Sequence, residues 1–313
     1  MRAWLFPGQG SQYVGMIRDL VEAFPSAREL LERAESLLGF PLGTLCFNGP
    51  DEQLRQTQYT QPALFVHEAI LVELLRDVLP ADAVAGHSVG EYAAFYAAGV
   101  LSFEDAVRLV RLRGQLMADA GSHSPGMMAA VIGLEDERVE ALCAELSQSN
   151  GIVVAANYNA PGQLVISGSA ELVRIAAERL RAAGALKVLE LPVSGAFHSP
   201  LMEPARERLA EAIQQTPFQR ARIPIYCNVS AEPLQEPDQL RHALIAQLTS
   251  PVRWKQTLQR LYADGVREFV EVGPGKVLQG LVKRTLSGVS IRGIDTAEDV
   301  RRIWADSSYE PTS

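Results

Sequence analysis

A pentapeptide around residue 88 carries the clearest sign of chemistry in this sequence. Residues 86–90 read Gly-His-Ser-Val-Gly, which matches the G-x-S-x-G pattern of a serine on a tight turn between a strand and a helix. In such a turn the glycines relieve crowding, and the N–H after the serine faces the oxyanion that forms during attack on a carbonyl. A structural glycine turn is the alternative. The apolar run before the motif and the small-residue segment after it favour Ser88 as a nucleophile.

A serine hydroxyl needs a base to become a good nucleophile, and the chain offers five histidines. His198 is the strongest candidate, because it lies in a loop between the end of a predicted strand and a helix that Pro200 would begin. His67 is expected to lie in the core or on the surface of its helix, and His87 to point away from the serine. His123, in a polar loop, and His242, in a helix, are expected to face solvent.

Arg113 is out of place on its predicted helix. The helix expected over residues 102–120 carries apolar residues at 106, 109, 110 and 117 on one stripe, and Arg113 falls on that stripe. A guanidinium on an inward face is costly unless it is paired. It could form a structural ion pair with an internal acid or extend to the surface. Alternatively, it could bind a carboxylate that arrives with a substrate.

The elements that must hold these residues alternate between strand and helix. The chain has 313 residues, 47% of them hydrophobic, which is enough to build a large core. Short apolar runs alternate with helical segments, one of which Pro62 is expected to open, and this predicts a parallel α/β sheet. Between 125 and 193 the predicted order becomes βαββαβ, the ferredoxin-like unit. The sequence therefore predicts a discontinuous catalytic domain, a small insert and a loose tail: 1–124 with 194–290, 125–193, and 306–313.

Composition excludes several classes of partner and cofactor. The net charge is −8 without a basic run, so a nucleic-acid partner is not expected. No apolar segment reaches the length of a signal peptide or a membrane span, and three widely spaced cysteines fit a reducing compartment, so we expect a cytoplasmic protein without a membrane partner. No cluster has metal-ligand spacing and no loop matches a nucleotide-binding motif, so no metal and no cofactor is expected.

Taken together, these motifs resemble one family, the malonyl-CoA:acyl-carrier-protein transacylases of fatty-acid and polyketide synthesis. The resemblance covers about residues 1–285. It runs in order through the segments at 6–12, 60–63, 86–92, 113–114, 159–163, 197–199, 250–254 and 271–275. It implies an α/β-hydrolase-like core with a ferredoxin-like insert, malonyl-CoA and an acyl carrier protein as partners, and no cofactor. We expect a monomer.

The resemblance also implies roles for individual residues. Ser88 would be the nucleophile, His198 the general base and later the acid, and Arg113 the ligand of the malonyl carboxylate. Backbone amides of Gln9 and Val89 would form the oxyanion hole. The family has no acidic third member of a catalytic triad, and the backbone carbonyl of Gln247 would orient the histidine instead. The side chains expected to contact the substrate are Met117, Phe197 and Asn159.

Acyl choice and pathway can also be predicted from the resemblance. An aromatic residue at 197 is typical of malonyl rather than methylmalonyl users, and Gly195, without a side chain, would make the pocket slightly roomier. Segments 59–65 and 195–199 resemble free-standing enzymes that load a polyketide synthase in trans. The housekeeping enzyme of fatty-acid synthesis and an acyl hydrolase acting on carrier-bound thioesters are alternatives. A plain esterase and a catalytically inactive docking module are rival interpretations.

Overall fold

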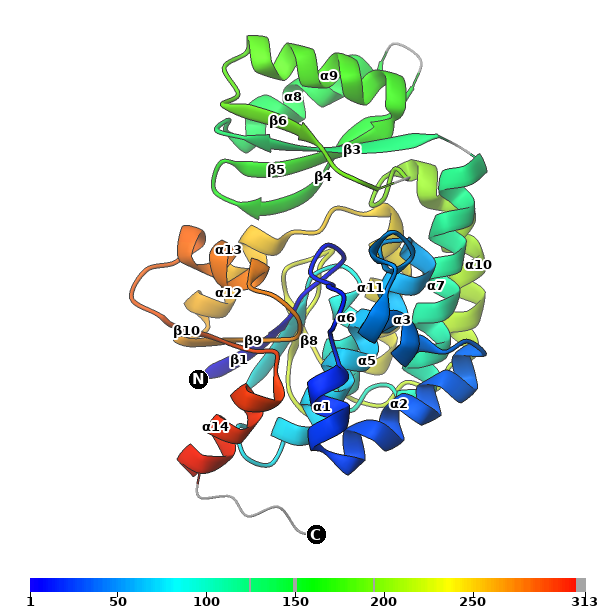
Figure 1. Cartoon of the computed structure of the whole chain (residues 1–313). Helices are drawn as coiled ribbons and strands as arrows, with labels where there is room; N and C mark the ends of the chain where they lie inside the picture. The colour runs from blue at the N-terminus through cyan, green and yellow to red at the C-terminus, as the bar shows by residue number, and fades with distance from the viewer. Residues whose placement is uncertain (124, 149–150, 194, 308–313) are drawn as a thin grey trace.

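The computed structural model describes residues 1–123, 125–148, 151–193 and 195–307, which build two sheets covered by helices (Figure 1). The strands are β1 (Arg2–Phe6), β2 (Ala83–Gly86), β3 (Gly126–Ile132), β4 (Val153–Ala160), β5 (Gln163–Ser169), β6 (Lys187–Glu190), β7 (Ile225–Tyr226), β8 (Pro233–Leu234), β9 (Glu268–Val272) and β10 (Ser290–Ile294). The helices are α1 (Arg18–Ala23), α2 (Pro25–Leu38), α3 (Leu42–Asn48), α4 (Asp51–Leu54), α5 (Thr57–Leu75), α6 (Gly90–Ala97), α7 (Phe103–His123), α8 (Asp136–Ser147), α9 (Ala170–Ala182), α10 (Glu203–Gln215), α11 (Pro237–Ala246), α12 (Trp254–Ala263), α13 (Val277–Thr285) and α14 (Ala297–Ser307), with short 3₁₀ turns η1 (Pro200–Met202) and η2 (Gln247–Thr249).

The larger sheet has the order β10-β9-β1-β2-β7-β8, and every pair is parallel except β7 with β8. Alternate residues of β1 pack in two separate hydrophobic cores, one on each face of the sheet, because successive side chains of a strand point to opposite faces. Trp4 and Phe6 pack with the helices α2, α5, α6 and α7, whereas Ala3 and Leu5 pack with α12 and α13. A sheet covered on both faces explains why the central strands β1 and β2 are short and mostly apolar, and the predicted parallel α/β sheet is confirmed.

Helix α5 corrects the prediction that Pro62 opens a helix. The helix begins at Thr57, so Pro62 is its sixth residue and removes one internal hydrogen bond. Nearly every α5 side chain is buried between the sheet and α7, and this burial stabilises the helix despite the proline. By contrast, α7 begins where predicted, because the Ser102 hydroxyl oxygen accepts a hydrogen bond from the Asp105 N–H, 3.1 Å away.

The smaller sheet lies at the top of the view in Figure 1, with α8 and α9 on its outer face. Its strand order, β4-β5-β3-β6, and its antiparallel pairs are those of a ferredoxin-like unit, as the βαββαβ pattern predicts. Ala129 and Val131 of β3 face the two helices, and the alternate residues Met128 and Ala130 face the main body. One face of this sheet therefore serves the insert's own core and the other faces the larger sheet's helices and loops.

The carboxyl-terminal part of the described chain differs from the predicted boundaries in two places. The catalytic domain was predicted to end at 290, but β10 continues the larger sheet to Ile294 and α14 packs beyond it. The predicted loose tail began at 306, whereas residues 306 and 307 belong to α14, and the rest of the predicted tail lies outside the described residues. Residues 124 and 194, where the predicted insert adjoins the catalytic domain, also lie outside them, so the domain boundaries stay predictions. Among the described helices, none has the length and apolar composition to cross a membrane.

Candidate active site

Ser88 sits on a strained turn between β2 and α6. Its φ of 54° lies in the left-handed region, which residues other than glycine seldom adopt. The two glycines of the motif allow this turn to pack closely. A Cβ on Gly86 would lie 2.0 Å from backbone atoms of Gly90, and a Cβ on Gly90 would lie 2.2 Å from the Phe6 carbonyl oxygen. The turn therefore presents the serine hydroxyl at the carboxyl end of β2, as the G-x-S-x-G pattern predicts.

His198 lies within hydrogen-bond distance of the serine. The Ser88 Oγ is 2.7 Å from the His198 Nε2, and the His198 Nδ1 is 3.0 Å from the Gln247 backbone carbonyl. Because a carbonyl only accepts, Nδ1 carries the proton and Nε2 is free to accept the one on the serine. Burial, with a smaller contribution from the Arg113 charge, lowers the pKa of His198 to about 3. The histidine is therefore neutral at physiological pH and can act as a base.

Arg113 is fully buried beside the same hydroxyl. Its Nη2 donates to the Ser88 Oγ at 3.1 Å and to the Gln247 Oε1 at 2.9 Å, and its Nη1 donates to the Gln61 Oε1 at 2.8 Å. The guanidinium also lies 5.7 Å from the centre of the Tyr92 ring. Within the described part of the chain no ion pair joins Arg113 to a carboxylate, so neither a structural salt bridge nor an extension to the surface accounts for it.

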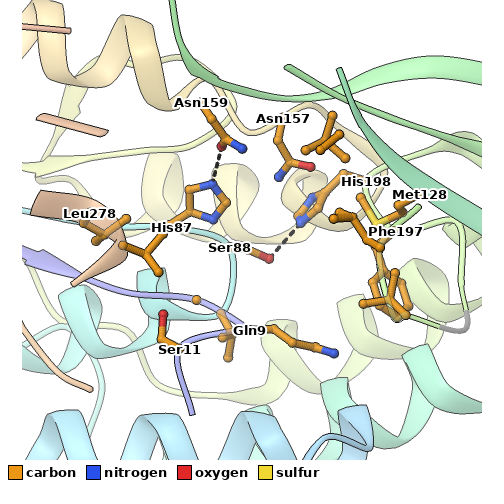
Figure 2. Close-up of a pocket in the computed structure, with 18 of the residues that line it drawn as sticks. Gln9, Ser11, His87, Ser88, Met128, Asn157, Asn159, Phe197, His198 and Leu278 are labelled. Atoms are coloured by element: carbon orange, nitrogen blue, oxygen red, sulfur yellow. Dashed lines mark hydrogen bonds between the residues drawn. The ribbon is translucent and has the colours of Figure 1, made fainter. Parts of the chain in front are cut away.

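A cavity of about 300 Å³ opens in front of these three side chains, between the two sheets (Figure 2). A bulge in β4 helps to line it. Val153 and Ala155 face α8 and α9, but a register shift after Ala155 turns Asn157 and Asn159 to the cavity side. Sequence reasoning included Asn159 and missed Asn157, because simple alternation along the strand does not reveal a bulge.

The predicted substrate-contacting residues line this cavity. Met117 and Phe197 are buried at its wall, and Asn159 accepts a hydrogen bond from the His87 Nε2 at 2.8 Å, which turns that histidine away from Ser88 (Figure 2). The prediction that Gly195 makes the pocket roomier is wrong. A Cβ there would lie 2.4 Å from the Phe197 ring, so the ring already occupies the space.

The two predicted oxyanion-hole residues flank the serine. Gln9 and Val89 both line the cavity, and within the described residues neither backbone N–H donates to a protein acceptor. The Gln9 side chain is held away from the hydroxyl by a 3.1 Å hydrogen bond to the Thr57 Oγ1. Two backbone donors near Ser88 are therefore available to a ligand, and their role as an oxyanion hole stays a prediction.

Three buried polar residues around the site were not found from the sequence. The Asn228 Oδ1 accepts the Ser88 N–H at 2.8 Å, and its Nδ2 donates to the Gly86 carbonyl at 2.6 Å. Glu91, at the start of α6, and Gln61, in α5, contact the network around Arg113. Glu91 follows the serine motif directly and Gln61 precedes Pro62, but nothing in the local pattern marks them as buried partners of a distant arginine.

The remaining histidines lie away from this chemistry. His67 is buried with its Nε2 2.9 Å from the Asp295 carbonyl oxygen, and His242 is exposed on α11. His123 was predicted in a polar loop but belongs to the last turn of α7, where it is exposed. Among the described residues, no group of three or more His, Cys, Asp or Glu residues could hold a metal ion.

A serine on a tight strand–helix turn, paired with a buried neutral histidine in a parallel α/β fold, is the arrangement of serine enzymes that work through an acyl-serine intermediate. Residues 3–303 match the family model of the acyl transferase domain. The malonyl CoA-acyl carrier protein transacylases of Bacillus subtilis and Staphylococcus aureus strain MRSA252 are each 42% identical to this chain, covering 95% of both chains in the first case and 96% and 97% in the second.

Solved structures agree with these relatives. An acyl carrier protein S-malonyltransferase from Vibrio cholerae superposes with a TM-score of 0.93 at 39% identity, covering 96% of this chain and 99% of the other. A malonyl-transacylase in complex with a type II polyketide synthase acyl-carrier protein also has a TM-score of 0.93, at 38% identity, covering 97% and 99%. The chain belongs to the acyl transferase family, among the malonyl-CoA:acyl-carrier-protein transacylases, and is an acyltransferase with an α/β-hydrolase-like core.

Proposed function

We propose that this protein transfers the malonyl group of malonyl-CoA to the phosphopantetheine thiol of an acyl carrier protein, through a malonyl ester of Ser88. The observation that carries the proposal is the Arg113 guanidinium. It contacts the Ser88 hydroxyl at 3.1 Å and has only neutral partners of its own. A buried cation in this position matches an acyl group that ends in a carboxylate.

The residues support a two-step exchange. His198 takes the Ser88 proton as Oγ attacks the thioester carbon, and the backbone N–H groups of Gln9 and Val89 are placed to bind the oxyanion. When the tetrahedral intermediate collapses, the carbon–sulfur bond breaks and His198 returns the proton to the departing CoA sulfur. The carrier thiol then attacks the ester, loses its proton to His198, and the proton returns to Ser88. All acids and bases in this scheme are side chains of the protein, so we propose that no cofactor is needed.

The test is to follow the malonyl group by intact-mass spectrometry. After incubation with malonyl-CoA we expect a malonyl adduct on Ser88, and after addition of holo carrier protein we expect that adduct to move to the carrier. Release as free malonate would identify a hydrolase instead, and absence of any adduct would leave only a docking role. Both outcomes contradict the proposal.

The pathway is the finer part of the proposal. We propose that the enzyme serves a polyketide synthase in trans, as segments 59–65 and 195–199 suggest, and the relative solved with a polyketide carrier supports this. The housekeeping role in fatty-acid synthesis is the alternative. The ratio of kcat/KM for holo carriers of the two pathways, taken from the source organism, decides between them. A higher value for the fatty-acid carrier contradicts the polyketide role.

The acidic limb of the pH profile is expected to be flat for an acyl donor without a charged acyl group. His198 is a base only when neutral, and because its pKa is lowered to about 3, it stays neutral as the pH falls through the usual histidine range. We expect the burst of Ser88 acylation by p-nitrophenyl acetate, an ester without a charged acyl group, to keep its rate from about pH 8 to about pH 5. A loss of rate with an inflection near pH 6.5 would contradict the lowered pKa.

Phe197 is expected to select against a branched acyl group. Its buried ring lines the cavity beside His198, and we propose that the ring crowds a methyl at C2 of the malonyl group. We expect Phe197→Ala to raise the methylmalonyl-to-malonyl ratio of kcat/KM by about tenfold, the usual worth of one methyl group in a tight pocket. Steady-state rates with the two CoA esters measure the ratio, and an unchanged ratio contradicts the role.

A further inference from the structure

Glu91 is a buried carboxyl group that the proposed reaction does not use. It lies in the first turn of α6 and has no exposed surface. Its Oε1 accepts the Asn228 N–H at 2.7 Å, and its Oε2 accepts the Gln247 Nε2 at 2.6 Å. Both oxygens act as acceptors from N–H donors, which is the arrangement that an ionised carboxylate satisfies.

The Gln247 amide connects Glu91 to Arg113. Its Nε2 donates to Glu91 and, at 2.9 Å, to the Ser88 carbonyl, while its Oε1 accepts from the Arg113 Nη2 at 2.9 Å. The amide can make all three bonds in one orientation only, because its nitrogen donates and its oxygen accepts. The other guanidinium nitrogen donates to the Gln61 amide oxygen. Arg113 is therefore held on two sides by neutral amide oxygens, and the Gln247 amide lies between it and the Glu91 carboxylate.

We propose that Glu91 is a positioning residue for acyl-group selection: its carboxylate fixes the Gln247 amide with the oxygen towards Arg113, so that the guanidinium is oriented by neutral acceptors and keeps its charge for the substrate. The inference rests on the proposed function, since it concerns the choice of an anionic acyl group. A direct Glu–Arg pair would orient the arginine equally well but would neutralise it.

The groups around Glu91 partly offset the effect of its burial. Burial raises the pKa of Glu91 to about 7, and the Asn228 N–H, the Gln247 amide and the Arg113 charge each lower it. The Arg113 charge therefore favours the ionised form of Glu91 across the intervening amide. The other ionisable groups that interact with Glu91 are Tyr92 and Cys227, whose own pKa values burial raises, so both are neutral near pH 7.

Glu91→Gln is the variant that tests the amide orientation. An amide in place of the carboxylate keeps the shape of the side chain, but its NH₂ group must then face another N–H donor. That donor is either the Gln247 Nε2 or the Asn228 backbone N–H. Turning the Gln247 amide over relieves the first conflict, and it then presents its nitrogen to Arg113 and loses its bond to Ser88. With its amide turned over, Gln247 no longer orients Arg113, while Ser88 and His198 stay intact.

The experiment measures kcat/KM for loading of malonyl-CoA and of acetyl-CoA. We expect Glu91→Gln to lower the malonyl-to-acetyl ratio by about tenfold or more, the worth of a buried hydrogen bond to a charged group. The matched control is Glu68→Gln in α5. Glu68 is also fully buried, burial raises its pKa far above the usual range, and in the described part of the chain its oxygens have no hydrogen-bond partner. This control is expected to change the ratio by less than about twofold.

A second variant keeps the test valid if Glu91→Gln folds poorly. The exchange Glu91→Gln with Gln247→Glu restores a donor–acceptor pair between the two positions, but it puts the carboxylate directly on Arg113 and removes the donor to the Ser88 carbonyl. We expect the exchange to unfold at a higher temperature than Glu91→Gln alone, while the malonyl-to-acetyl ratio stays low. Recovery of the ratio, or an unchanged ratio in Glu91→Gln, overturns the inference. Failure of the wild type to prefer malonyl would instead overturn the proposed function.

Discussion

Replacing Ser88 by alanine is expected to abolish the malonyl-enzyme intermediate and to lower transfer by about 10⁴-fold or more, because among the described residues no other hydroxyl is hydrogen-bonded to His198. The variant loses one bond to His198 and one to Arg113 but keeps the backbone of the turn, since serine and alanine bear the same cost at a φ of 54°. Intact-mass spectrometry after incubation with malonyl-CoA measures the adduct, and a coupled assay measures transfer.

The control for this substitution is Ser167→Ala in β5. Ser167 is fully buried, and within the described residues its hydroxyl has no hydrogen-bond partner. It lies in the smaller sheet and does not line the cavity, so removing its hydroxyl shows the effect of losing a buried serine hydroxyl that takes no part in the reaction. We expect the control to form the adduct at the wild-type rate. An adduct on Ser88→Ala of the same mass would show that another residue accepts the malonyl group, and the assignment of the nucleophile would be wrong.

The parts of the site that depend on local patterns were predictable from the sequence. Ser88 lies between two glycines, and a Cβ added to either would come within 2.2 Å of backbone atoms. The turn is therefore encoded in five consecutive residues. The burial of Arg113 follows from its place on an apolar helical stripe, and a position after a strand suggested His198. In each case the signal comes from residues that are neighbours in the sequence.

The parts that depend on contacts between distant segments were not predictable. The bulge that turns Asn157 and Asn159 towards the cavity is visible only when β4 is paired with β5. The Phe197 ring fills the space at Gly195, which the missing side chain alone would suggest is empty. The side chain of Gln247 bonds both to Arg113 and to Glu91, which lies 156 residues before Gln247 in the sequence. The resemblance indicated a role only for the backbone carbonyl of Gln247. Tertiary packing likewise overrides the local preference of Pro62.

Arg113→Ala is expected to separate the two acyl groups. The malonyl carboxylate would lose a charge-assisted contact in a buried cavity, and we expect kcat/KM for malonyl-CoA to fall by about a hundredfold or more. Acetyl-CoA offers no carboxylate, so its loading is expected to fall by less than about tenfold. Part of the loss is common to both substrates, because the substitution leaves the oxygens of Gln61 and Gln247 without their donor.

The ratio of the two losses therefore isolates the contribution of the carboxylate. Arg113→Lys serves as the matched control, since an ammonium keeps the positive charge but cannot form two parallel bonds to a carboxylate while still reaching both amide oxygens. We expect its malonyl-to-acetyl ratio to lie between those of the wild type and Arg113→Ala. Equal losses with both substrates in Arg113→Ala would mean that the guanidinium only supports the cavity. Its unpaired charge beside Ser88 would then need an explanation other than substrate recognition.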